Sequence, residues 1–302
     1  MRIVSLLPSL TDLVCSLGRG DELVGVTHEC DFPPGVEFLP RVVRSRISDD
    51  ASSVEIDRLI AEQGGSLYEL DLETLAGLRP TLILTQEQCD VCAINESKVR
   101  KAAADLPGHP AVESVNPTDL ESVFEMFRRI GDLLGSNQSA EKLIDGFHKT
   151  VDEIDRRIVG ASVPKVLILE WIDPPFSSGH WNPELIDRAG GREVIGQSKE
   201  RSKRITWGEV AHADPEIILV AACGLSIDRA EGDLMNLTRR SEWQTLRAVR
   251  NENVYITDGS AYFSRPGPRL EASLRIAAEV IHPDRFSEFA PENSIRRIRG
   301  VA

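Results

Sequence analysis

Several features are scarce or missing in this 302-residue sequence, and each absence narrows what the protein can be. No apolar run approaches the ~20 residues of a membrane-spanning helix. The amino terminus lacks the charged segment, the long apolar segment and the small-residue cleavage site of a secretion signal. From the sequence as it stands we expect a cytoplasmic location, or an extracytoplasmic one if a leader has been removed.

Positive charge is in deficit. The chain has 35 Lys and Arg against 48 Asp and Glu, a net charge of -13. Such a balance argues against nucleic acid or an anionic membrane surface as the main partner.

Cysteines are few, odd in number and dispersed, which favours a reduced intracellular protein over a disulfide scaffold. They are Cys15, Cys30, Cys89, Cys92 and Cys223.

What the sequence does contain is a regular alternation of short apolar strands and amphipathic helices in both halves, with a long helix between them. Apolar residues recur at three- and four-residue steps from Asn137 to about Val159, which predicts a helix of about six turns. We therefore expect an α/β fold of two lobes with parallel sheets, joined by one long helix. The predicted parts are residues 1–118, a helical connector over 119–160, and residues 161–302.

Four predicted loops follow strands at their carboxyl ends, where open parallel sheets bind ligands. They cover residues 28–34, 86–95, 171–181 and 260–268. Their aromatic and polar content suits a large, flat, partly polar ligand. The residues concerned are Phe32, Trp171, Phe176, His180, Trp181, Tyr262, Phe263 and Arg265.

Short motifs in these loops and around the helices give the chain a family likeness. They are RIVSLLPS (2–9), DFPP (31–34), DLE (71–73), LRP (78–80), IDPPFSSG (172–179), YFSR (262–265) and PR (268–269). In order and spacing they resemble the solute-binding proteins of importers for vitamin B12, siderophores and haem, and most closely the vitamin B12 branch. The resemblance spans nearly the whole chain and implies class III solute-binding-protein architecture, with two Rossmann-like lobes joined by one long rigid α-helix.

The resemblance also implies a corrinoid such as cobalamin, held between the lobes without catalysis and without a required cofactor. The positions that match corrinoid contacts are Phe176, Arg265 and, nearby, Pro8. Phe176 would pack on side groups of the macrocycle, and Arg265 would donate to peripheral amides or a phosphate. Glu96 and Glu209 lie near the carboxylates with which family members dock on a permease, although Glu209 is offset by about one position.

Two positions depart from the family pattern. Glu29 and Gln86 stand where aromatic residues are expected, and Tyr68, Trp171 and Trp181 are candidates to compensate. The ligand is therefore a corrinoid or another chelate, with an iron siderophore or haem as the alternative.

A cysteine and histidine set supports a different hypothesis, an intracellular metal or redox protein. His28, Cys30, Cys89 and Cys92 lie on two predicted loops at one end of the same sheet and make a plausible four-ligand zinc set. A Cys89–Cys92 disulfide and inert thiols are the other interpretations. His28 or His180 can alternatively ligate the cobalt of a corrinoid through a neutral imidazole.

No spacing matches a nucleophile elbow or another catalytic signature. Glu170 and Asp173 are expected to form a solvated strand end. The sequence therefore predicts a monomeric, non-catalytic binding protein for a metal chelate, with an ABC permease as the partner that the resemblance implies.

Overall fold

The computed structural model describes residues 1–45, 51–63, 68–87, 96–238 and 240–299. The chain divides into two compact units: unit 1 is Met1–Pro117 with Ser122–Leu143, and unit 2 is Thr118–Glu121 with Ile144–Ala302. The chain thus passes from one unit to the other after residues 117, 121 and 143. The predicted boundaries, which set the connector apart as a third part, stay a prediction.

Unit 1 is built on a parallel sheet. Its strands, in the order in which they lie side by side, are β2 (Leu23–Gly25), β1 (Ile3–Ser5), β5 (Leu82–Gln86) and β6 (Ala111–Val115). A separate antiparallel pair consists of β3 (Val43–Ser45) and β4 (Tyr68–Leu70). The helices of this part of the chain are α1 (Pro8–Ser16), α2 (Ser53–Gln63), α3 (Leu72–Leu78), α4 (Glu96–Asp105) and α5 (Leu120–Leu133).

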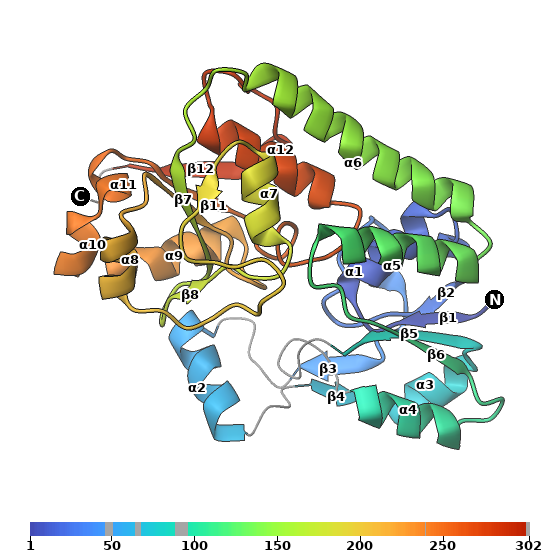
Figure 1. Ribbon diagram of the computed structural model, residues 1–302. Helices are drawn as coiled ribbons and strands as arrows, with labels where there is room; N and C mark the ends of the chain where they lie inside the picture. Colours follow the sequence, from blue (N-terminus) through green and yellow to red (C-terminus); the bar gives the residue numbers. More distant parts are fainter. Residues whose placement is uncertain (46–50, 64–67, 88–95, 239, 300–302) are drawn as a thin grey trace. The chain divides into compact units, whose positions relative to one another are not determined.

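Helices cover both faces of the unit 1 sheet, with α1 and α5 on one face and α3 and α4 on the other (Figure 1). One buried cluster packs between the sheet, α3 and α4. Its buried members are Val4, Leu6, Val42, Val43, Leu75, Ile83, Val99, Ala103 and Leu106. A sheet covered on both faces needs strands that are apolar throughout, and the sequence Leu82–Leu84 of β5 meets that need.

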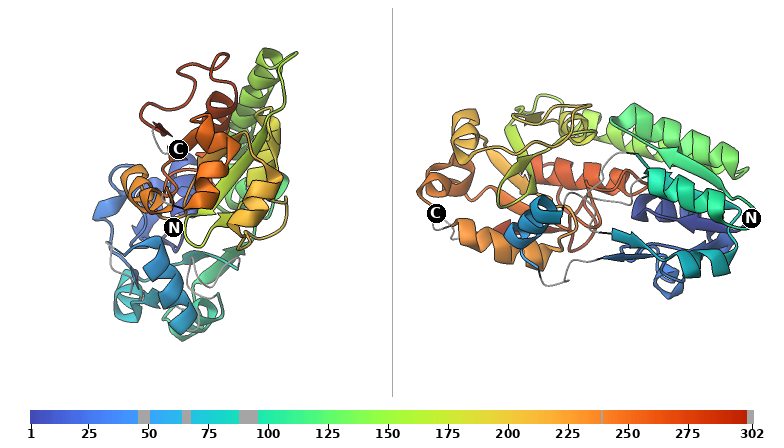
Figure 2. Two further views of the ribbon diagram at one scale, coloured as in Figure 1. Left: turned by 90° about the vertical axis from the view of Figure 1, so that its left-hand side faces the viewer. Right: turned by 90° about the horizontal axis from the view of Figure 1, so that it is seen from below.

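Helix α6 (Asn137–Arg157) is the long helix that the residue spacing predicts. It runs without a break in all views (Figures 1 and 2). Its first turns belong to unit 1 and the rest, from Ile144 onward, to unit 2. Ala140, Ile144 and Ile154 of its apolar stripe are at most 2% exposed. The predicted two-lobed α/β architecture with a long linking helix is therefore confirmed.

Unit 2 contains a mixed sheet with a parallel centre. Its strands lie in the order β12 (Ile295–Ile298), β11 (Val254–Thr257), β10 (Ile217–Val220), β7 (Lys165–Trp171) and β8 (Phe176–Ser177), and β9 (Arg192–Glu193) also pairs with β7. The three central strands and β9 are parallel, whereas β12 and β8 run antiparallel to their neighbours. The prediction of a parallel sheet holds for the centre, and the antiparallel β8 and β12 were not foreseen.

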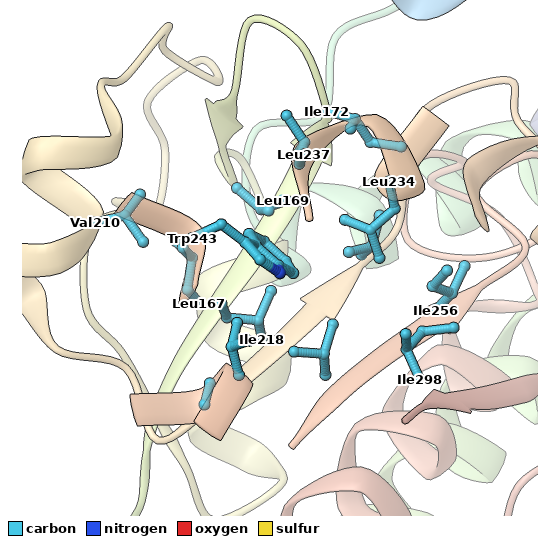
Figure 3. Packing of buried hydrophobic residues seen from close by; sticks show 14 of the residues in the cluster. Leu167, Leu169, Ile172, Val210, Ile218, Leu234, Leu237, Trp243, Ile256 and Ile298 are labelled. Carbon is cyan, nitrogen blue, oxygen red and sulfur yellow. The ribbon is translucent and has the colours of Figure 1, made fainter. Parts of the chain in front are cut away.

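The unit 2 helices are α7 (Asn182–Arg188), α8 (Trp207–Ala213), α9 (Ile227–Leu237), α10 (Ser241–Thr245), α11 (Arg247–Arg250) and α12 (Leu270–Ile281). Helices α8, α9 and α10 pack on one sheet face, where Trp243 lies among Leu167, Ile218 and Leu234 (Figure 3). Side chains of α7 and α12 converge with β7 at Gly191, where an added Cβ would come within 2.9 Å of both Ile281 and Val166.

Local features set the ends of three short helices in unit 2. Helix α9 begins at Ile227, after Ser226, whose hydroxyl accepts from the Arg229 amide at 3.5 Å. Helix α10 ends before Leu246, whose extended backbone (ψ 135°) separates it from α11. Among the described residues, no helix is long and apolar enough to cross a membrane.

Candidate ligand-binding site

In unit 1, the predicted ligand residues follow strands that end at one edge of the sheet. Strands β1, β2 and β5 are parallel, so their carboxyl ends share an edge. Pro8 is the first residue of α1, just after β1, and is buried. Gln86 is the last residue of β5 and is half-buried. The segment after β2 carries His28, Glu29 and Phe32.

His28, Glu29 and Tyr68 come together in unit 1. The rings of His28 and Tyr68 lie 5.2 Å apart, and the Tyr68 hydroxyl donates to Oε1 of Glu29 at 3.3 Å. Nε2 of His28 is 3.9 Å from the same Glu29 oxygen. An imidazole, a phenol and a carboxylate thus sit side by side, a group that can donate and accept hydrogen bonds or offer a metal ligand.

Arg41 holds the loop that carries these residues. Its Nη1 donates to the carbonyl oxygens of Thr27 at 2.5 Å and Cys30 at 2.8 Å. The loop then passes through a cis peptide bond at Phe32–Pro33, and Phe32 is 38% exposed. Sequence reasoning missed Arg41, because nothing local marks an arginine that binds carbonyls 11 and 14 residues away.

Cys30, one of the four predicted zinc ligands, is 1% exposed, and its Sγ lies 3.0 Å from Oγ1 of Thr11. Cys89 and Cys92 fall outside the described residues. Within the described ranges, no group of three or more His, Cys, Asp or Glu side chains is placed to hold a metal ion. The zinc hypothesis stays a prediction. Burial, and after it the Asp12 carboxylate, raise the pKa of the neighbouring Cys15 thiol to about 11.

In unit 2, Trp171 is the last residue of β7 and Phe176 is the first residue of β8. The two residues are partners in the antiparallel β7–β8 pair. The Arg204 guanidinium lies 5.7 Å from the centre of the Phe176 ring, within cation–π range. Trp171 is half-buried and packs against the hydrophobic cluster of Figure 3, so part of this ring is core.

Trp181 and Phe263 connect the two predicted loops of unit 2. Nε1 of Trp181 donates to the carbonyl oxygen of Phe263 at 2.8 Å. Trp181 is 4% exposed and Phe263 is 0% exposed. Phe263 has a positive φ of 63°, and its amide donates to Oγ of Ser273 at 3.0 Å. The two rings therefore support the loops from inside the protein.

His180 lies beside Trp181, with ring centres 5.5 Å apart. Its backbone has a φ of 54°, held by a hydrogen bond from its amide to the Glu200 carbonyl at 2.7 Å. Burial, and after it the Arg201 charge, lower the pKa of His180, so the ring is neutral at neutral pH. Its Nε2 is buried and has no hydrogen-bond partner within the described parts of the chain. A buried ring nitrogen of this kind costs free energy unless something binds it.

The loop after β11 is shaped by Asp258, whose Oδ1 accepts from the amides of Ser260 and Ala261 at 2.8 and 3.0 Å. Tyr262 and Arg265 follow, both half-buried. Burial raises the pKa of the Tyr262 phenol, which therefore stays protonated and able to donate.

The two predicted docking carboxylates are engaged locally. Oε2 of Glu209 accepts from the amide of Thr206 at 2.7 Å and from its hydroxyl at 2.8 Å, completing the capping box of α8. The backbone hydrogen bond lowers the pKa of Glu209. Glu96 begins α4 and pairs with Arg100 at 2.5 Å. Their docking role stays a prediction.

The expectation that Glu170 forms part of a solvated strand end is wrong. Its Oε1 accepts from the Gly179 amide at 3.1 Å and from Nδ2 of Asn182 at 2.7 Å. Burial raises its pKa. Asp173, the other residue of that pair, forms an ion pair with Arg240 at 2.9 Å. The sequence did contain a signal for a buried role of Glu170, because this acidic residue stands at the end of an apolar strand, shortly before the Ser-Ser-Gly sequence at 177–179.

Two α/β units, each with a parallel sheet edge followed by polar and aromatic loops, form the architecture of the class III solute-binding proteins. The chain belongs to the periplasmic binding protein family, whose model matches residues 3–261.

Named relatives span most of the chain at low identity. An uncharacterized ABC transporter substrate-binding lipoprotein of Bacillus subtilis is 23% identical over 95% of this chain and 82% of its own length. The vitamin B12-binding protein of Vibrio cholerae is 21% identical over 89% of this chain and 84% of its own. A periplasmic heme-binding protein of Pseudomonas aeruginosa has a TM-score of 0.72 and 22% identity, covering 94% of this chain and 93% of that one.

Proposed function

We propose that this chain is the substrate-binding component of an ABC importer and that its ligand is a corrinoid. The family match and the names of the Bacillus subtilis and Vibrio cholerae relatives support both parts. The observation that carries the proposal is the position of the candidate residues. In each unit most of them lie at or after the carboxyl ends of parallel strands, the place where α/β proteins bind ligands.

The proposed contacts come from both units. Unit 1 offers Pro8, Glu29, Phe32, Tyr68 and Gln86. Unit 2 offers Trp171, Phe176, His180, Tyr262 and Arg265, with Trp181 and Phe263 behind them. Phe176 and Trp171 supply flat apolar area for the macrocycle, and Arg265 donates to its peripheral amides or phosphate.

The proposal includes binding without catalysis, work outside the cytoplasmic membrane and a permease as the partner. The Bacillus subtilis relative is named as a lipoprotein of an ABC transporter, which supports the location and the partner. Glu96 and Glu209 are the candidate docking residues on this chain.

Haem is the second candidate ligand, and two observations favour it. The Pseudomonas aeruginosa structure with a TM-score of 0.72 is a heme-binding protein. His180 offers a neutral imidazole whose Nε2 has no partner within the described residues. After a turn of its ring, such a nitrogen can ligate the iron of haem or the cobalt of a corrinoid.

The test is to incubate the purified protein separately with cyanocobalamin, hemin and a ferric siderophore, to desalt each sample, and to record visible spectra and bound stoichiometry. We expect one cyanocobalamin to be retained per chain. Retention of hemin alone would replace the corrinoid by haem, and retention of none of the three would overturn the proposal. A zinc assay on the same samples, repeated on Cys89→Ser, tests the metal hypothesis: stoichiometric zinc lost in that variant would support it.

A further inference from the structure

Glu193 binds a cluster of donors in the interior of unit 2. Its oxygens accept from the backbone amides of Ile168, Val194, Ile195 and Gly196 and from the Ser178 hydroxyl, at 3.0–3.1 Å. Three of these amides are consecutive and converge on Oε1, which makes a small anion-binding nest. The carboxylate thus connects β7, the loop after β8, and the segment that follows β9.

Glu170 connects the same parts from the other side. Its Oε1 binds Gly179 and Asn182, and its Oε2 accepts from the Ser202 hydroxyl. Ser202 belongs to the segment 193–203, and Gly179 to the segment 176–182. Two carboxylates therefore fasten these two segments to each other and to β7.

Glycines allow the two segments to touch. A Cβ on Gly179 would lie 2.5 Å from the Glu200 carbonyl oxygen, and a Cβ on Gly196 would lie 2.1 Å from Oγ of Ser178. Between these contacts, His180 exchanges backbone hydrogen bonds with residues 199 and 200. The candidate ligand residues Phe176, His180 and Trp181 thus lie on a segment whose shape depends on residues 193–203.

The two carboxylates differ in what protonation would do to them. Burial raises the pKa of both, and the Glu193 charge raises that of Glu170 further. A proton on Glu193 would face the Ile168 amide or the nest, where backbone donors cannot turn away. A proton on Glu170 Oε2 would face the Ser202 hydroxyl, which can turn and accept. The other titratable or charged groups on these elements are Lys165, Asp173, His180, Glu184, Asp187, Arg188, Arg192, Lys199, Glu200, Arg201 and Lys203.

We propose that Glu193 and Glu170 are the positioning residues of the ligand-binding segment 176–182, with Glu193 required as an anion and Glu170 required only as a hydrogen-bond acceptor. The proposal rests on the proposed function for the meaning of that segment. It predicts opposite outcomes for the same chemical substitution at two neighbouring carboxylates. Glutamine at 193 places an NH₂ group against fixed backbone donors, whereas glutamine at 170 can donate to Ser202.

The experiment compares Glu193→Gln, Glu170→Gln and the wild type by hydrogen exchange and by binding of cyanocobalamin and hemin at pH 5.5 and 8. Glu193→Gln should speed exchange in peptides covering 176–182 and 193–203 and weaken binding roughly ten- to hundredfold. Glu170→Gln should stay within about threefold of the wild-type affinity at both pH values and keep wild-type exchange.

Glu279→Gln is the matched control. Glu279, on α12, also accepts from two backbone amides, but these belong to Phe289 and Ala290, at 2.8 and 2.7 Å, and to neither of the two segments. It should lower the melting temperature without changing affinity. Equal loss of affinity in the control would make the effect global and overturn the proposal.

Wild-type exchange and affinity in Glu193→Gln, or equal losses in both glutamine variants, would also overturn it. If Glu193→Gln does not fold, Ser178→Ala removes one donor to Glu193 and should speed exchange in the same peptides, and unchanged exchange there would count against the proposal. If the wild type binds neither probe, the proposed function fails, and the exchange data alone decide whether the two carboxylates position the segment.

Discussion

The hydrogen bond from Trp181 to Phe263 gives a prediction whose size follows from the structure. In Trp181→Phe the Nε1–H is lost, and the buried Phe263 carbonyl loses that donor. An unsatisfied buried acceptor costs about 1–3 kcal/mol, and the smaller ring adds a cavity of about 1 kcal/mol. We therefore expect the free energy of unfolding of unit 2 to fall by about 2–4 kcal/mol.

Urea unfolding followed by tryptophan fluorescence measures this loss, because all four tryptophans, at 171, 181, 207 and 243, lie in unit 2. The buried pair Trp207 and Trp243, with ring centres 5.5 Å apart, remains as the reporter in the variant. With a slope of about 2 kcal/mol per molar urea, the midpoint should drop by about 1–2 M.

Trp171→Phe is the matched control, because it removes a tryptophan that is only half-buried and leaves the hydrogen bond from Trp181 to Phe263 in place. It should lower the free energy of unfolding by less than about 1 kcal/mol. A Trp181→Phe variant as stable as that control would refute the view that this hydrogen bond holds the two loops together.

Three further predictions follow from the same unit. Arg265→Ala should weaken ligand binding by about 1.5–3 kcal/mol in calorimetry, with the melting temperature nearly unchanged, and equal affinity would remove Arg265 from the site. Burial lowers the pKa of His282, whose Nε2 lies 3.3 Å from the Gly190 carbonyl oxygen. The unfolded chain therefore binds more protons at this histidine than the folded chain does, and the free energy of unfolding should fall as the pH drops below about 6.5. His282→Asn should reduce this fall, which urea titrations at pH 7.5 and 5.5 measure. Gly179→Ala should lose about 1–3 kcal/mol of unfolding free energy, since its Cβ would lie 2.5 Å from the Glu200 carbonyl oxygen, and an unchanged urea midpoint would contradict that contact.

Much of the fold could be predicted from the sequence, because it depends on local residue patterns. The spacing of Ala140, Ile144 and Ile154 gives one face of a helix, and the apolar runs of β5 and β7 give strands buried on both faces. The capping box of Thr206 and Glu209, which the structure shows, is equally local.

The missed elements depend on partners far away in the chain. Strand β12, Ile-Arg-Arg-Ile, has no period of two, and it is a strand because it pairs with β11 about 40 residues earlier. Its two arginines are exposed, as charged residues on edge strands often are, and Arg296 pairs with Asp228 of α9 at 2.7 Å. Helix α9 has a helical spacing of apolar residues at Ile227, Ala230 and Leu234, but Gly224 just before it is typical of a loop.

The candidate site was predictable as a set of loops but not as a set of contacts. Strand order brings residues 28–32 and 86 to one edge, and that follows from parallel topology. The contact of Tyr68 with Glu29 and the carboxylates Glu170 and Glu193 were not predictable, since each joins segments with no shared local pattern.

The path of the chain between the units limits how the protein can be cut. Thr118–Glu121 belongs to unit 2, where the Leu120 amide donates to Glu184 at 3.2 Å and Asp119 pairs with Lys199 at 3.2 Å. A fragment starting at residue 144 would therefore lack the partners that Leu120 and Asp119 provide for Glu184 and Lys199. During synthesis, unit 1 cannot be completed until residue 143 has left the ribosome, and by then the first piece of unit 2 has already been made.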